Sequence, residues 1–369
     1  MFSNVYRGEI DEPDRLPGDP KKIAVKKTFI KGDVKKQPMM ESRILKVLHR
    51  YRHKNVMQLL YTFTNEHDEV ACIGLIFEYM PSTLHNYIRN WPKLIENRPD
   101  MVEVKLLCWQ IFRGLRHLAD NNVIHRDLKP QNILVNPENG LLKIGDFGSS
   151  KIYRPGEPNH PYHVTRYYRA PELLLRAALY GPEIGKAALY GPEIDLWSTG
   201  CILGEMLKGR VLLPGSSTVN QFHQIVAVLG KPTLEDCEAM RTKDPAELNE
   251  ASTQKYCEMA PKTAVEGFRR LLPKVPSEAC DILAQIMTYK PKNREACDIL
   301  AQIMTYKPKN RLGGQAALGH KFFAQLFEDG VRRFNGKPIT VVTKTDLESA
   351  LKHEIEDHSH TADSSEEHA

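Results

Sequence analysis

The feature that most constrains this chain is the segment from His125 to Asn132, followed after a short spacer by Asp146. It reads His-Arg-Asp-Leu-Lys-Pro-Gln-Asn, and Asp146 opens the triplet Asp-Phe-Gly. One carboxylate can orient a hydroxyl, the amide and the second carboxylate can bind magnesium, and the lysine can steady a phosphate. The two segments together therefore predict a site for phosphoryl transfer from ATP.

Composition sets the remaining limits. The 369 residues are 41% apolar and 26% charged, which is ordinary for a globular protein and long enough for two lobes or domains. The apolar runs are too short to predict a membrane span, and no signal peptide opens the chain. Seven cysteines without a C-x-x-C pair predict reduced thiols, hence a cytoplasmic protein that can also be nuclear. The net charge of +5 suits acidic or phosphorylated substrates and gives little reason to expect nucleic acid.

The two motifs are similar to those of the eukaryotic protein kinases. The similarity extends over about Phe2 to Phe327. It implies an α+β, two-lobed fold: a small antiparallel sheet with one helix, then a mainly helical lobe, with ATP in the cleft between them. It also implies ATP and Mg²⁺ as cofactors and proteins with Ser or Thr as substrates.

The resemblance also divides the chain. We expect a kinase domain at 1–328, with its N-lobe at 1–80 and its C-lobe at 81–328, and an extension at 329–369. The acidic, histidine-rich composition of the end predicts a disordered tail from about residue 345.

The N-terminal segment resembles the second half of a kinase Gly-rich loop, with the first two glycines and their strand expected before Met1. Ile23 to Lys26 has the character of a strand, and Lys26 matches the lysine that pairs the α- and β-phosphates. Apolar spacing predicts a helix that carries Glu41, which the resemblance makes the partner of Lys26. The alternative is that Glu41 is a solvated surface residue.

The resemblance implies a nucleotide site in the next strand and its connector. Phe77 would guard the adenine pocket, and the backbones of Glu78 and Met80 would hydrogen-bond adenine. The remaining nucleotide contacts would come from Val5, Ala24, Gln131 and Leu134.

Four side chains take the catalytic roles that the resemblance implies. Asp127 would be the base for the substrate hydroxyl, and Lys129 would reach the γ-phosphate. Asn132 and Asp146 would hold the metal. A lysine at position 129 is typical of Ser/Thr kinases.

The segment after Asp146 narrows the resemblance. Gly-Glu-Pro-Asn at 156–159 leads to Tyr162, and Thr165 to Glu172 follows. This string resembles glycogen synthase kinase 3, in the group that also contains cyclin-dependent and MAP kinases. In that family the tyrosine, here Tyr162, is autophosphorylated.

The same family prefers substrates that already carry a phosphate four residues after the target, which it reads with three cations. Arg126 and Lys151 match two of them, with Arg166 and Arg169 nearby. The third falls on Met40, whose thioether cannot replace an arginine. We therefore expect a weakened preference for such primed substrates.

Three further residues have structural roles in the family. Asp195 would support the catalytic loop through backbone hydrogen bonds, and Glu172 would pair with Arg311. A scaffold protein would dock on the C-lobe after Leu229, although the sequence beyond Thr233 departs from the family.

Two exact duplications interrupt the C-lobe. Residues 177–184 recur at 187–194, and residues 278–294 recur at 295–311. Two copies do not make a solenoid, so the identity indicates recent tandem duplication or an error in assembling the sequence. Because two identical helices compete for one groove, we expect the second copy, continuous with Leu312, to occupy it.

Three functions fit these residues. The leading interpretation is an active Ser/Thr kinase, because all six catalytic residues are present. A pseudokinase or binding scaffold is the alternative that the missing glycines, Met40 and the insertions suggest. A cyclin-dependent or MAP-like kinase is disfavoured by Tyr162 and by the absence of a T-x-Y motif between Asp146 and Thr165.

Overall fold

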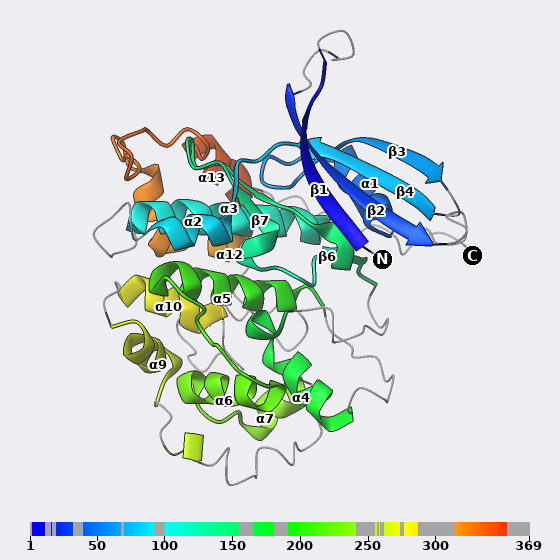
Figure 1. Cartoon of the computed structure of the whole chain (residues 1–369). Helices are drawn as coiled ribbons and strands as arrows, with labels where there is room; N and C mark the ends of the chain where they lie inside the picture. The colour runs from blue at the N-terminus through cyan, green and yellow to red at the C-terminus, as the bar shows by residue number, and fades with distance from the viewer. Residues whose placement is uncertain are drawn as a thin grey trace, which may run out of the picture.

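The N-terminal part forms an antiparallel sheet backed by one helix, as a computed structural model of the chain shows (Figure 1). The strand order is β1-β2-β4-β3. The strands are β1 (Phe2–Glu9), β2 (Lys22–Lys31), β3 (Leu59–His67) and β4 (Val70–Glu78). The helix α1 (Met40–Arg50) buries Ile44, Leu45 and Leu48, the face that their helical spacing predicts.

The structure describes most of the chain but not all of it. The described residues are 2–11, 16, 20–31, 40–67, 70–91, 100–154, 165–180, 191–240, 255–256, 258, 262–273, 277–286 and 314–352. Tyr162 and Arg311 therefore lie outside the described residues, as do the second copy of the longer duplication and residues 353–369. Among the described helices, none is both long and apolar enough to cross a membrane.

The large lobe is mainly helical. Its first part contains β5 (Ser82–Thr83), α2 (Leu84–Asn90), α3 (Met101–Asp120), β6 (Val123–Ile124), β7 (Ile133–Val135), β8 (Leu142–Ile144) and β9 (Lys151–Ile152). Its later helices are α4 (Pro171–Tyr180), α5 (Glu193–Lys208), α6 (Thr218–Leu229), α7 (Leu234–Ala239), α9 (Ala264–Leu271), α10 (Ser277–Ile286), α12 (Gly314–Leu318) and α13 (Lys344–Lys352). Together with the sheet and α1, they confirm the predicted α+β, two-lobed fold.

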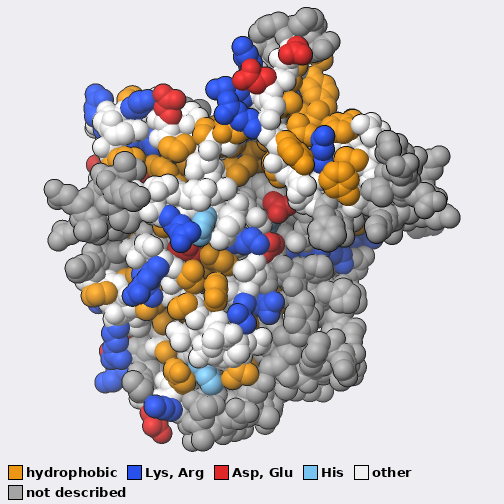
Figure 2. Space-filling model, viewed as in Figure 1, with side chains coloured by type: hydrophobic (Ala, Val, Ile, Leu, Met, Phe, Trp, Pro, Cys, Tyr) orange, Lys and Arg blue, Asp and Glu red, His pale blue; other side chains and the backbone are white. Residues whose placement is uncertain are grey.

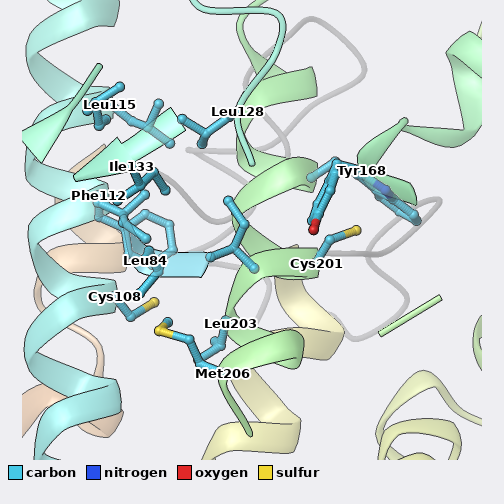
Figure 3. Close-up of a cluster of buried hydrophobic side chains, with 14 of the residues drawn as sticks. Leu84, Cys108, Phe112, Leu115, Leu128, Ile133, Tyr168, Cys201, Leu203 and Met206 are labelled. Carbon is cyan, nitrogen blue, oxygen red and sulfur yellow. The ribbon is translucent and has the colours of Figure 1, made fainter. Parts of the chain in front are cut away.

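The interior of the large lobe is built around α3 and α5. Figure 3 shows Cys108 and Phe112 of α3 facing Leu203 and Met206 of α5. Nearly every residue from Ile194 onward in α5 is buried, as expected for a helix that is apolar on all sides. Helix α3 also packs against β6 and β8, the strands that precede and follow the catalytic loop in the sequence.

The duplications are placed differently from our expectation. The first copy of the longer one supplies α10, which buries Ala279, Cys280 and Leu283 and packs against α5 and α9. The expectation that the second copy occupies this groove is therefore wrong. A reason is chain connection: only a short segment joins α9 to the first copy, so docking that copy closes a small loop.

The prediction of disorder from about residue 345 is also wrong in part, because residues 344–352 form α13. Thr343 caps the helix: its hydroxyl accepts from the backbone of Asp346 at 3.1 Å, while its own N–H donates to the Asp346 carboxylate at 2.9 Å. The tail composition is strongly polar, but this reciprocal cap and the tertiary contacts described below stabilise a helix there.

Candidate active site

The centre of the site is the ammonium group of Lys26. It donates to Glu41 Oε1 at 2.7 Å and to Asp146 Oδ1 at 2.8 Å. Thus β2, α1 and the turn after β8 converge on one cation. The Glu41 side chain is only 7% exposed, so the alternative of a solvated surface glutamate is excluded. The Asp146 side chain is 49% exposed and presents its carboxylate to the cleft.

The register of the sheet sets the face that lies above this cation. Val5 is opposite Lys26 in β1, and Ala24 is opposite Phe77 in β4. Since side chains alternate along a strand and directly opposed residues share a face, Val5, Ala24, Lys26 and Phe77 all project from the same side of the sheet. Val5 is 68% exposed, which leaves one end of this face open.

The other predicted nucleotide contacts lie at the end of β4, on the connector after it and between Gln131 and Leu134. Glu78 ends β4 opposite Ile23, and its side chain pairs with Lys143 Nζ at 2.5 Å. Met80 and Leu134 are half-buried against the core, on the connector and on β7. Gln131 is exposed, and its amide lies 3.3 Å from His85 Nδ1.

Charged side chains of both signs gather on the face where the small lobe meets the large lobe (Figure 2). The turn at Asp146 is unusual there, because Asp146 adopts a left-handed backbone with φ of 55°. Such conformations are costly for residues other than glycine and concentrate at functional sites. Gly148 follows, and a Cβ there would lie 3.6 Å from Lys26 Nζ and 3.8 Å from Glu41 Oε2. A Cβ at 148 would therefore be in ordinary van der Waals contact with the ion cluster.

The catalytic loop forms a second cluster around Asp127. Lys129 Nζ donates to Asp127 Oδ2 at 2.6 Å, and the amide of Asn132 donates to the same oxygen at 3.1 Å. The Asn132 amide also donates to the backbone oxygen of Asp127 at 2.8 Å. These bonds use the amide nitrogen, and among the described residues no partner is found for the amide oxygen, which can therefore act as a ligand.

Thr165 completes this cluster and was not assigned a role from the sequence. Its hydroxyl donates to Asp127 Oδ1 at 2.7 Å and accepts from Lys129 Nζ at 3.0 Å. The residue was visible as the start of the Thr165 to Glu172 string. The sequence gives only a weak signal for this contact, because Thr165 lies 38 positions from Asp127 and 36 positions from Lys129.

The loop is held from below by Asp195 of α5. Its carboxylate accepts the backbone N–H of His125 at 2.7 Å and that of Arg126 at 2.9 Å. These are the hydrogen bonds that the resemblance implies. Burial raises the pKa of this carboxyl, an effect that His125 and these donors partly offset. Arg126 has a positive φ of 68°, so the bonds secure a strained turn.

The predicted phosphate-reading cations are only partly placed. Arg126 Nε donates to the backbone oxygen of Ser149 at 2.6 Å, and Lys151 begins β9 beside β6. Arg166 stacks on the ring of Tyr167 at 5.8 Å, and Arg169 follows the same turn. Met40 begins α1 and is 46% exposed. Glu172 is buried in α4, while its expected partner Arg311 lies outside the described residues.

The donor set suits magnesium. A half-exposed carboxylate on Asp146 and an amide oxygen on Asn132 are the hard oxygen ligands that Mg²⁺ prefers. Asp146 lies on a turn with a left-handed backbone, and Asn132 ends the 3-10 turn Pro130–Asn132. The adjacent Lys26 would balance the charge of phosphates that bridge such an ion.

Comparison with known proteins agrees with this geometry. The protein kinase domain model matches residues 15–323. Protein kinase gsk3 of Schizosaccharomyces pombe is 32% identical over 299 residues, covering 80% of this chain and 67% of that protein. Glycogen synthase kinase 1 of Pyricularia oryzae is 36% identical over 256 residues, covering 69% of this chain and 59% of that protein. The chain thus spans roughly three fifths to two thirds of each relative. With its two lobes, its paired Lys26 and Glu41, and its clustered catalytic loop, the chain belongs to the protein kinase family and resembles the glycogen synthase kinase 3 type of Ser/Thr kinase.

Proposed function

We propose that this chain transfers the γ-phosphoryl group of Mg-ATP to serine or threonine hydroxyls of proteins. The observation that carries the proposal is the bridging ammonium of Lys26, held by Glu41 at 2.7 Å and Asp146 at 2.8 Å. In kinases this pairing and a metal-binding aspartate must both be in place for transfer.

The chain's own residues supply four parts of the reaction. Lys26 binds and orients the phosphates. Asp146 and Asn132 would hold the metal, which would neutralise negative charge on the phosphates. Asp127 accepts the proton of the attacking hydroxyl. Its Oδ1 already accepts a hydrogen bond from a hydroxyl, that of Thr165, at 2.7 Å. Lys129, bound to Asp127, offers a cation to the transferring phosphate.

The test is transfer of phosphate from Mg-ATP to a Ser-rich peptide, with Asp127→Asn as the control. We expect transfer by the natural chain, and a loss on the order of a hundredfold or more in the control. Absence of transfer by the natural chain, with ATP still bound, would favour the scaffold alternative.

The finer specificity is also part of the proposal. Substrates that already carry a phosphate should be preferred only weakly, because Met40 stands where a third cation is expected and α1 packs next to β9, which carries Lys151. Comparing a primed and an unprimed peptide gives the ratio. Met40→Arg should raise it about tenfold through one charge-assisted hydrogen bond, whereas the isosteric Met40→Leu should leave it unchanged.

A ratio that is already large in the natural chain, or unmoved by Met40→Arg, would contradict this assignment.

Autophosphorylation of Tyr162, scaffold docking after Leu229, and a location in the cytosol or nucleus complete the proposal. Free thiols at Cys72, Cys108 and Cys280 support a reducing compartment.

A further inference from the structure

The C-terminal helix α13 is bound to the loop that follows α1. Lys54 Nζ in that loop donates to Asp346 Oδ2 of α13 at 2.6 Å. On the other side of Asp346, Arg113 Nη1 of α3 donates to its backbone oxygen at 2.7 Å. In Figure 1 the orange-red α13 lies next to α3, level with the small lobe. Asp346 thus joins three elements that are far apart in the sequence.

The two halves of this loop are held in different ways. The second half is bound by backbone hydrogen bonds: Met57 N–H donates to the oxygen of Ile144, and Ile144 N–H donates to the oxygen of Asn55, both at 2.9 Å. The Asn55 amide is also buried and donates to Gln110 Oε1 at 2.9 Å. This half is therefore fixed to β8 and α3 independently of α13.

The half that is nearer α1 depends on side chains. The ring of His53 stacks on that of His117 of α3, with centroids 4.8 Å apart, and Lys54 reaches Asp346. Burial lowers the pKa of His53 to about 3, so the stacked ring is neutral at physiological pH. Among the described residues of this half, Lys54 supplies the charged contact with the large lobe, beside the uncharged contacts with His117.

Asp346 is itself held in place. Thr343 donates to its carboxylate from both the backbone, at 2.9 Å, and the hydroxyl, at 3.0 Å. The far end of α13 is bound as well, because the amide of Gln315 in α12 donates to the oxygen of Leu351. Although burial opposes it, the hydrogen bonds from Lys54 and Thr343 hold the pKa of Asp346 below its usual range, so the carboxylate is ionised.

We propose that Asp346 is a positioning residue for the kinase reaction: through Lys54 it holds the C-terminal end of α1, and so keeps Glu41 within reach of Lys26. A helix behaves as a short rod, so a displacement at Arg50 is carried along the 11 residues of α1 to Glu41. Catalytic groups lose rate when misplaced by about 1 Å, so a modest movement of α1 is enough to matter. The inference rests on the proposed function.

The test is Lys54→Met, which removes the charge and leaves the cap of α13 intact. The matched control is Lys344→Met on the same helix, because Lys344 pairs with the exposed Asp329 at 2.7 Å on the surface. We expect Lys54→Met to lower kcat/KM about three- to tenfold and to speed amide exchange in α1. Lys54→Arg should restore both, and Lys344→Met should change neither by more than about twofold.

Two further results decide whether the effect passes through Glu41. In a Glu41→Gln background, Lys54→Met should cause no additional loss, because the pair that it positions is already broken. Full additivity in that background, unchanged exchange in α1, or an equal effect of Lys344→Met would each overturn the proposal. Amide exchange does not require transfer, so a chain without kinase activity would refute the proposed function while leaving this contact testable.

Discussion

Two buried cation–carboxylate pairs in this protein are built for different purposes. Arg333 and Glu103 are fully buried, at 0% exposure each, and meet through two nitrogens at 2.6 and 2.9 Å. Lys26 and Glu41 are also buried, but their cluster opens to the cleft through Asp146, which is 49% exposed. The difference is in what remains available to a ligand.

The interior pair is saturated. Arg333 also donates to the backbone oxygens of Pro137 and Glu138, and Tyr87 donates to Glu103 at 2.9 Å. Gly140 is required beside it, because a Cβ there would lie 2.8 Å from Arg333 Nε. In the cleft, an ammonium with three N–H groups has two carboxylate partners, and it can still bind a phosphate. A closed network stabilises, and an open one can bind.

The largest expected contrast comes from removing the two cations. Lys26→Met should lower kcat/KM on the order of a hundredfold or more, because the phosphates lose their fixed charge. Its melting temperature should stay near that of the natural chain, because Glu41 can take up a proton. Steady-state kinetics and a thermal melt check this. Activity that is within tenfold of the natural chain would show that the cleft cluster is only structural.

Arg333→Met should do the reverse. It leaves Glu103 as an uncompensated buried charge, which costs about 3–5 kcal/mol of unfolding free energy. Activity per folded molecule should be unchanged, since Arg333 contacts none of the cleft residues. Urea unfolding measures the loss, and Arg333→Met with Glu103→Gln should recover part of it. A stable Arg333→Met variant with impaired transfer would reverse the comparison.

Helix α10 sharpens the comparison, because its sequence from residue 278 onward is repeated in the chain, whereas the segment around Arg333 occurs once. Ile282→Asp would bury a charge in the docked copy and should cost at least about 2–4 kcal/mol. Ile299→Asp, the same change in the other copy, should cost little. Unfolding curves of the two variants distinguish the copies. If each single variant is tolerated and only the double variant unfolds, the two copies exchange in one groove.

The smallest expected effect is on the pH profile of the cleft. Burial raises the pKa of Glu41, and Lys26 offsets only part of this. As the pH falls, Glu41 therefore binds a proton at a higher pH in the folded chain than in the unfolded chain. Its contribution to stability is present below its unfolded pKa and is lost as the pH rises through the folded pKa. The pair with Lys26 needs the ionised form, so activity responds oppositely and falls as the pH falls.

We therefore expect the acid limb of kcat/KM to lie above the ordinary glutamate value of 4.5. Asp146 does not account for this limb: although burial opposes it, Lys26 holds the pKa of that carboxyl below its usual range. Glu41→Gln should have low activity without this limb. An unchanged acid limb in Glu41→Gln would assign the titration elsewhere.

Much of the site follows from local sequence. Helical spacing placed Glu41 on the buried side of its helix, and the run from His125 to Asn132 concentrated base, amine and amide in one loop. Neighbours in a sequence stay neighbours in a fold, so a compact motif predicts a compact site. The α5 segment is likewise apolar on nearly all sides, which is the pattern of a helix in the interior, and Asp195 lies near its start.

Only the tertiary structure decided the contacts between distant segments. Nothing near Arg333 in the sequence indicates a partner 230 residues away, and Thr165 meets Asp127 only when two loops pack together. Composition predicted disorder where α13 forms. The prediction failed because Lys54, Arg113 and a cap stabilise this helix, rather than an apolar face that composition could reveal. Identical sequences cannot rank the two copies of α10 either. Their energies differ only through chain connection and packing, and the whole fold sets both.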